Sequence, residues 1–150
     1  MDSIPVVVIS GQVASHLIGS DAFQETDMMG ISRPIVKHSF LVQSAEEIPV
    51  VIKKAFHIAT SGRPGPVVID VPKNMTDPNY KFEYKYPKDL VMRSFPILGK
   101  GNDEKIAAAI ELFRAAKKPV IYSGGGTIQA DASKELTEFS KLIGLSLIHI

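Results

Sequence analysis

The stretch Pro66-Val67-Val68-Ile69-Asp70-Val71-Pro72 decides the fold class of this chain. Its β-branched residues run without polar alternation, which is typical of a strand buried on both faces of a parallel sheet. Shortly before it, Gly62 suits the left-handed cap of a helix, and Pro64 prevents that helix from continuing. The sequence therefore predicts a helix followed by a buried strand.

The preceding residues complete a strand–helix–strand unit. Ser44-Ala45-Glu46-Glu47 fits a capping box, in which the Ser44 hydroxyl accepts the Glu47 amide and the Glu47 carboxylate reaches back. The predicted helix carries apolar residues at helical spacing, namely Ile48, Val51, Ile52, Ala55 and Ile58 or Ala59. Residues 34–42 alternate apolar and polar side chains and predict a strand. This order indicates a right-handed βαβ unit.

A further strand is predicted over residues 4–10, apolar and buried on both faces. Residues 11–33 show no periodicity and predict a long polar loop with a short helical turn near residues 23–28. A loop of about 20 residues in a compact domain is more often functional than idle. Asp21 is either the N-cap of that turn, or the loop binds a substrate, with Gln24 orienting a polar group and Phe23 supplying an apolar wall.

Residues 73–102 lose all helical period and predict an interdomain linker on the surface. Prolines punctuate this segment, and aromatic residues alternate with polar ones at Tyr80, Phe82, Tyr84 and Tyr86. We expect these aromatic side chains to be pinned to a neighbouring domain.

The second half of the chain begins another α/β pattern. Asn102 is predicted to cap a helix whose apolar residues are Ile106, Ala109, Ile110 and Phe113, and a short buried strand follows over residues 119–123. After the triple glycine 124–126, Asp131 is predicted to cap a third helix that Gly144 ends, before a strand over residues 145–150. The fold class is therefore α/β with parallel sheets, the end of one sheet domain followed by the start of another.

Composition excludes several classes of protein. The 150 residues are 45% hydrophobic with a formal net charge of +1, so no basic stripe matches a nucleic acid. The apolar runs are too short to span a membrane, and the chain has no cysteine. The four histidines lack metal-binding spacing, so no metal site is predicted, and no nucleophile motif of the GxSxG type occurs. A cytoplasmic or organelle-matrix location is the expectation.

Ligands of open parallel sheets bind at the carboxyl ends of the strands. Three segments occupy such positions: the loop from Gly11, the residues after Val71, and the triple glycine. The glycines are either a tight turn or a nucleotide contact, and Gln129 departs from the GxGxxG pattern. Lys73 is either a solvated lysine or one that holds an anion.

Several segments together resemble the catalytic large subunits of acetolactate synthases, also called acetohydroxyacid synthases. They are residues 3–13, 19–25 (Gly-Ser-Asp-Ala-Phe-Gln-Glu), 37–42, 61–67 (Ser-Gly-Arg-Pro-Gly-Pro-Val) and 70–73 (Asp-Val-Pro-Lys). The Arg-Pro-Gly-Pro segment occurs across many thiamine-diphosphate enzymes, whereas Gly-Gln-Val combined with Asp-Ala-Phe-Gln-Glu is more particular to this family.

The resemblance implies a thiamine-diphosphate-enzyme fold of which this chain is an internal piece. Residues 1–74 would be the C-terminal half of the domain that binds the pyrimidine ring of the cofactor. Residues 75–101 would be an interdomain linker, and residues 102–150 the N-terminal part of a central domain that holds FAD. On this expectation the apolar surfaces of the piece are covered by other segments, so the isolated chain should aggregate.

Family roles then fall on particular residues. The resemblance implies that Phe23 and Gln24 are catalytic residues lining the active site. It implies a substrate channel that includes Lys73, Gly11, Ala14 and Ala22. It also implies FAD contacts from Arg93 and from three glycines, Gly124, Gly125 and Gly126.

The implied reaction joins pyruvate to a second 2-oxoacid, pyruvate or 2-oxobutyrate, giving acetolactate or acetohydroxybutyrate for isoleucine and valine synthesis. The implied cofactors are thiamine diphosphate, Mg²⁺ and FAD. The catalytic glutamate and the Mg²⁺-binding segment of the family lie outside this chain, so we expect the isolated chain to be inactive. The implied assembly is a homodimer or tetramer of catalytic subunits with a small regulatory subunit, located in the cytoplasm or in a plastid or mitochondrial matrix.

Two alternatives to this function remain open at the level of the sequence. One is another thiamine-diphosphate enzyme, such as glyoxylate carboligase or pyruvate oxidase. The other is a non-catalytic nucleotide-binding α/β module, in which the triple glycine is only a turn.

Overall fold

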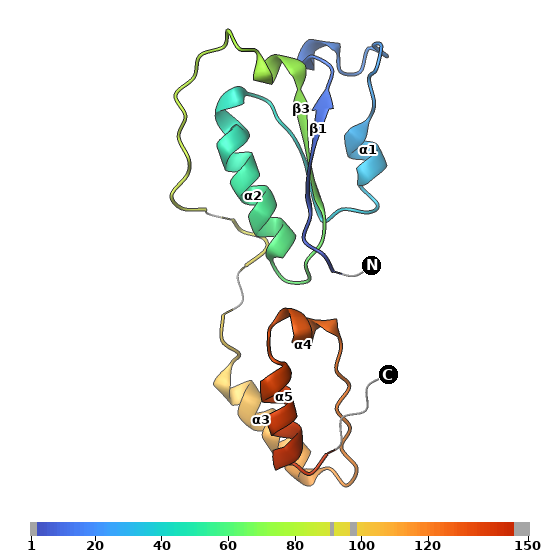
Figure 1. The fold of residues 1–150 in the computed structure, drawn as a ribbon, viewed down its shortest axis with the longest axis vertical. Coiled ribbons are helices and arrows are strands. Elements are labelled where there is room, and N and C mark those ends of the chain that lie inside the picture. The colour runs from blue at the N-terminus through green and yellow to red at the C-terminus, as the bar shows by residue number, and fades with distance from the viewer. Residues whose placement is uncertain (1–2, 91, 97–98, 146–150) are drawn as a thin grey trace. The chain divides into compact units, whose positions relative to one another are not determined.

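A computed structural model describes residues 3–90, 92–96 and 99–145 of the chain. These residues belong to two compact units, Met1–Gly99 (unit 1) and Lys100–Ile150 (unit 2). Unit 1 contains a small parallel sheet with helices, and the described part of unit 2 is helical (Figure 1). The α/β prediction is therefore confirmed, and its parallel sheet lies in unit 1.

Three parallel strands form the sheet of unit 1 in the order β1-β3-β2. They are β1 (Val7–Gln12), β2 (His38–Leu41) and β3 (Val67–Pro72). The central strand β3 buries its first four residues almost completely, as its apolar run predicts. The strand predicted over residues 4–10 forms as β1, but the expectation that it is buried on both faces was wrong, because its Ile9 is 63% exposed. Among the described residues β1 is an edge strand that pairs with β3 alone.

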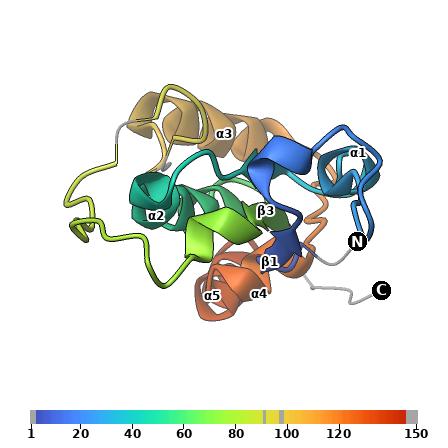
Figure 2. The same cartoon turned by 90° about the horizontal axis from the view of Figure 1, so that it is seen from above.

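Helix α2 (Ile48–Thr60) covers the sheet with the apolar face that its spacing predicts. Val51, Ala55 and Ile58 are buried and form one core cluster with residues of β3. Gly62, at φ +56°, takes the left-handed conformation that ends the helix. The short helix α1 (Met28–Ser32) lies on the other side of the sheet from α2, as Figures 1 and 2 both show. Burial from both sides explains why β3 is apolar apart from Asp70.

The capping box predicted at the start of α2 was wrong. A 3₁₀ turn, η2 (Ala45–Glu47), comes first, and α2 begins after it. Within this turn the Glu47 amide donates to the Ser44 backbone carbonyl at 3.3 Å, so it does not bond to the Ser44 hydroxyl. The Glu47 carboxylate reaches back one residue further and accepts the amide of Gln43.

The loop after β1 contains different helical turns from the one predicted. A 3₁₀ turn, η1 (Ser15–Leu17), comes first, and α1 begins where the predicted turn near residues 23–28 ends. Asp27 caps α1, since its carboxylate accepts the Gly30 amide at 2.8 Å. Asp21 is therefore not the N-cap, and its φ of +59° is incompatible with the extended backbone of an N-cap residue.

The segment after β3 is tied to unit 1. It starts with the 3₁₀ turn η3 (Lys73–Thr76), and its described residues then contain no helix or strand up to residue 96. Tyr80 donates its hydroxyl to the Glu46 carboxylate at 2.6 Å, which lowers the pKa of Glu46 and raises the pKa of Tyr80. Lys53 of α2 donates to the carbonyls of Pro87 and Lys88 at 2.6 and 2.7 Å. Tyr80 thus contacts η2, which belongs to the same unit 1 as the segment. The predicted domain boundaries at residues 74 and 102 stay predictions.

The described part of unit 2 consists of three helices: α3 (Asp103–Ala115), α4 (Gly125–Gln129) and α5 (Ser133–Leu142). Asn102 caps α3 as predicted, since its side chain accepts the Lys105 amide at 2.9 Å. Phe113 and Phe139 join α3 to α5 through an edge-to-face contact with ring centroids 5.4 Å apart. Gly144, at φ +69°, follows the end of α5 as predicted.

Two expectations for unit 2 were wrong, and a third concerns residues of which the structure describes only one. Asp131 does not cap α5, because its φ is +53° and the N-cap residue is Ala132. Residues 119–123 form no strand, and Val120 is 83% exposed, since no described segment of unit 2 offers a strand with which to pair. The strand predicted over residues 145–150 lies, apart from Leu145, outside the described residues.

Candidate functional site

The carboxyl edge of the sheet holds a cavity of about 570 Å³. Because β1 and β3 are parallel, Gln12 at the end of one strand pairs with Pro72 at the end of the other. The walls come from these strands, from α2 and from η3, and consist of Ile9, Ser10, Gly11, Gln12, Ile48, Ile52, Ile69, Val71, Lys73 and Thr76. Gly11 and Lys73, which are 62 positions apart in the sequence, thus line one cavity.

Ala14 is held next to the same edge by the loop after β1. The Ser15 amide donates to Asn74 Oδ1 at 2.8 Å, and Asn74 Nδ2 donates to Ser15 Oγ at 3.0 Å. These bonds join the neighbour of Ala14 to the neighbour of Lys73. Of the four residues expected to form a substrate channel, three therefore gather at this edge.

The fourth, Ala22, lies with Phe23 and Gln24 on a tight loop that Glu25 organises. The Glu25 carboxylate accepts the amides of Gly19 and of Ala22, the latter at 2.9 Å. These two backbone bonds lower the pKa of Glu25. The side chain thus closes the loop over residues 19–25.

The two expected catalytic residues project from this loop into solvent. Phe23 is 89% exposed. Gln24 has a φ of +66°, a conformation that is uncommon for a residue with a side chain and that marks functional turns. The side-chain amide of Gln24 makes no hydrogen bond to any residue that the structure describes, so its donor and acceptor atoms are available to a polar ligand.

A buried polar network was missed at the level of the sequence. Asp70 of β3 is only 1% exposed, and its two carboxylate oxygens accept Ser10 Oγ at 2.7 Å and Gln12 Nε2 at 3.0 Å. Gln12 Nε2 also donates to the Thr26 carbonyl at 2.7 Å. A carboxylate within an apolar strand needs buried partners, and that was the signal available in the sequence.

The residues expected to bind FAD are not brought together within one unit. Arg93 is exposed in unit 1, whereas Gly124, Gly125 and Gly126 are exposed in unit 2 around the start of α4. A Cβ atom built on any of the three glycines meets no atom within 4 Å. In unit 2, therefore, the glycines do not form a cradle that a side chain would fill.

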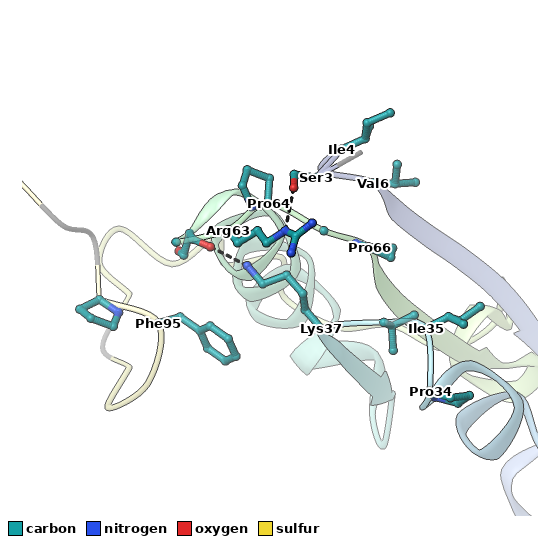
Figure 3. Close-up of a pocket in the computed structure, with 15 residues that line it drawn as sticks. Ser3, Ile4, Val6, Pro34, Ile35, Lys37, Arg63, Pro64, Pro66 and Phe95 are labelled. Carbon is teal, nitrogen blue, oxygen red and sulfur yellow. Dashed lines mark hydrogen bonds between the residues drawn. The ribbon is translucent and has the colours of Figure 1, made fainter. Parts of the chain in front are cut away.

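A second cavity, of about 880 Å³, lies at the opposite, amino end of the strands. Its walls include residues that precede each strand, such as Val6, Lys37 and Pro66. Arg63 Nε donates to Ser3 Oγ at 2.8 Å in this cavity, and Figure 3 shows the two side chains facing each other. None of the predicted site residues lines this cavity. The candidate active site is therefore the smaller cavity at the carboxyl edge together with the loop over residues 19–26.

Within the described residues no three histidine or acidic side chains come close enough to hold a metal ion. None of the described helices has the length and apolar character needed to cross a membrane.

Comparison with known proteins supplies the family. The acetolactate synthase large subunit of Haemophilus influenzae is 53% identical over 144 residues, which are 96% of this chain and 25% of that protein. This chain corresponds to a segment of the acetolactate synthase large-subunit family. The acetolactate synthase isozyme 3 large subunit of Escherichia coli is likewise 53% identical over 148 residues, 99% of this chain and 26% of that protein. The chain thus spans about a quarter of the length of the curated relatives it matches.

The fold of this chain is that of thiamine-diphosphate enzymes. Residues 106–149 match the family described as "Thiamine pyrophosphate enzyme, central domain". An X-ray structure from Mycobacterium smegmatis, solved as a candidate thiamin diphosphate-dependent enzyme, aligns with a TM-score of 0.76 and 23% identity. That alignment covers 96% of this chain and 27% of the other.

Proposed function

We propose that the enzyme containing this segment condenses pyruvate with a second 2-oxoacid, pyruvate or 2-oxobutyrate, in branched-chain amino-acid synthesis. The observation that carries the proposal is the carboxyl-edge cavity, which Gly11 and Lys73 both line, with the loop of Phe23 and Gln24 after β1. The identity of 53% to the large subunit from Haemophilus influenzae supports the same reaction.

The edge residues have the chemistry that a 2-oxoacid requires. The Lys73 ammonium attracts the substrate carboxylate, and the side chains of Ile48, Ile52 and Val71 give the cavity apolar walls. The Gln24 amide, which both donates and accepts, orients the carbonyl or hydroxyl of the substrate, and the Phe23 ring shields its apolar side. Thiamine diphosphate, when bound, supplies the carbon nucleophile for the condensation.

The three cofactors of this proposal are supported by different observations. An apolar cavity with one cation at its rim fits the organic part of thiamine diphosphate and an anionic substrate. The proposal assigns the Mg²⁺ ligands and the catalytic glutamate to parts of the enzyme outside this chain. FAD binding by Arg93 and the triple glycine rests on the family resemblance alone, because no glycine-dependent cradle is present in unit 2.

The proposal also includes a site shared between catalytic subunits, in a dimer or tetramer that a small regulatory subunit can bind. On this arrangement the 150-residue chain alone is inactive, because the groups that activate the cofactor belong to other segments.

The test is an assay of the complete enzyme with thiamine diphosphate, Mg²⁺, FAD and pyruvate, with and without 2-oxobutyrate. We expect acetolactate, and acetohydroxybutyrate when 2-oxobutyrate is present. The Lys73→Met variant should raise KM for pyruvate roughly tenfold, as loss of a charge-assisted contact predicts. Consumption of glyoxylate, or a requirement for oxygen, would instead indicate glyoxylate carboligase or pyruvate oxidase. A protein without turnover and without a flavin spectrum would indicate a nucleotide-binding module.

A further inference from the structure

We propose that Gln12 and Asp70 are positioning residues that fix the loop carrying Phe23 and Gln24 to the sheet. This inference rests on the proposed function, since that function makes Phe23 and Gln24 contact the substrate. Neither Gln12 nor Asp70 need touch the substrate for the inference to hold.

The register of the sheet creates the network. Ser10 of β1 pairs directly with Asp70 of β3. Alternate residues of a strand point to the same face, so Gln12 lies on the face of Ser10, two residues further along. This geometry explains how one carboxylate accepts both the Ser10 hydroxyl and the Gln12 amide.

The Asp70 carboxylate gives the Gln12 amide a fixed orientation. A carboxylate that is 1% exposed is stable only when hydrogen bonds compensate its lost hydration. Its Oδ2 atom accepts the Gln12 side chain at 3.0 Å. Rotation of the Gln12 amide would leave that oxygen without its donor, and such a loss is costly in a buried site.

The other atoms of the Gln12 amide are committed to the loop. Nε2 donates its second hydrogen to the Thr26 carbonyl at 2.7 Å, and Oε1 accepts the Val13 amide at 2.9 Å. The two bonds hold the first residue after β1 and the last residue before the Asp27 cap of α1. The loop is therefore tied at its base by Gln12 and closed at its tip by Glu25.

The left-handed backbone at Gln24 makes this tie relevant to function. A φ of +66° is costly for a residue with a side chain and persists only when the surrounding structure imposes it. Among the described hydrogen bonds of the loop, the Gln12–Thr26 bond is the one that links the loop to the buried Asp70, because the same Gln12 side chain also donates to Asp70. The turn that carries Gln24 is closed locally, since the Glu25 amide donates to the Ala22 carbonyl at 2.9 Å. Release of the Thr26 carbonyl should therefore let this turn, with Gln24 on it, move relative to the sheet.

The experiment compares two variants of the complete enzyme that each remove one hydrogen bond from Asp70. Gln12→Met removes the bond to Asp70, the bond to the Thr26 carbonyl and the bond from the Val13 amide, whereas Ser10→Ala removes only its bond to Asp70. The measurements are the melting temperature, amide hydrogen exchange over residues 19–26, and kcat and KM for pyruvate. Because Gln12→Met also frees the Val13 amide, we expect it to lose at least as much melting temperature as Ser10→Ala does. Gln12→Met should speed loop exchange roughly tenfold, as loss of the bond to the Thr26 carbonyl predicts, and lower kcat, whereas loop exchange should be unchanged in Ser10→Ala.

A second pair of variants covers the case in which Gln12→Met does not fold. Gln12→Glu places a carboxylate beside Asp70, and Asp70→Asn in the same chain supplies an amide that donates to it. The double variant should recover the melting temperature lost in Gln12→Glu but not the loop protection, because the introduced carboxylate cannot donate to the Thr26 carbonyl.

Equal loop exchange in Gln12→Met and Ser10→Ala would overturn the inference, as would recovery of loop protection in the double variant. Loop exchange is measured without substrate. An enzyme that makes no acetolactate but shows the expected exchange pattern would refute the proposed function and retain the tie. An enzyme that makes acetolactate, but whose loop exchange is unchanged by Gln12→Met, would retain the proposed function and refute the tie.

Discussion

Glu25 shows how one exposed side chain can shape a functional loop. Its carboxylate accepts the Gly19 and Ala22 amides, and these bonds lower the pKa of Glu25. The closed loop thus binds the proton less tightly than the open loop does. The stabilisation is present above the ordinary glutamate pKa of about 4.3 and is lost as pH falls through the lowered pKa.

We expect the amide resonances of Gly19 and Ala22 to titrate together in an NMR experiment on the 150-residue chain. The midpoint should lie below the ordinary glutamate value, because both amides report ionisation of Glu25. Glu25→Gln is the control and should abolish the titration of both signals. A midpoint at or above the ordinary value would contradict the assignment of these bonds.

At the scale of the element, Lys37 ties the approach to β2 to the end of α2. Its ammonium donates to the carbonyls of Ile58 and Ser61, which the helix leaves without internal partners. Partial burial lowers the pKa of Lys37. Gly65 leaves room for this side chain, since a Cβ atom there would lie 3.0 Å from Lys37 Cγ and Cδ.

Lys37→Met should therefore destabilise unit 1 by about 1–2 kcal/mol, because two carbonyls lose a charged donor near the negative end of a helix. Denaturant unfolding followed by circular dichroism measures this loss. Lys54→Met makes the same substitution at a lysine within α2. It is the matched control and should alter stability by less than about 0.5 kcal/mol. Equal losses in the two variants would mean that the lost charge, rather than the two bonds, is responsible.

The same scale explains what the sequence could predict. The strand β3 and helix α2 follow from local signals, namely an uninterrupted apolar run and a helical period that ends at Gly62. The strand expected over residues 119–123 has equally apolar residues but finds no partner among the described parts of unit 2. Strand formation depends on pairing, which local propensity does not report.

The candidate site also has one part that the sequence could predict and one part that it could not. The topological rule for parallel sheets is sufficient to place Gly11 and Lys73 at one edge. The bridge from Asp70 through Gln12 to Thr26 was not predicted, since it depends on the register that sets Ser10 against Asp70 across 60 positions of sequence.

At the scale of the whole molecule, the edge strand β1 governs how copies of the chain should interact. Among the described residues β1 pairs with β3 alone, and its Ile9 side chain is 63% exposed. An apolar edge strand with free backbone groups is a template for pairing with another chain. We therefore expect the 150-residue chain to associate with itself as its concentration rises.

Ile9→Lys should reduce this association, because a charge on an edge strand opposes strand-to-strand pairing. Ile31→Lys is a matched control, since Ile31 is 62% exposed but lies on α1, away from the sheet edge. Sedimentation velocity over a range of concentrations measures the distribution of species. Association should fall with Ile9→Lys and persist with Ile31→Lys. Both variants replace an exposed isoleucine with lysine, and only Ile9 lies on the edge strand β1. Equal effects would assign the association to exposed apolar surface in general.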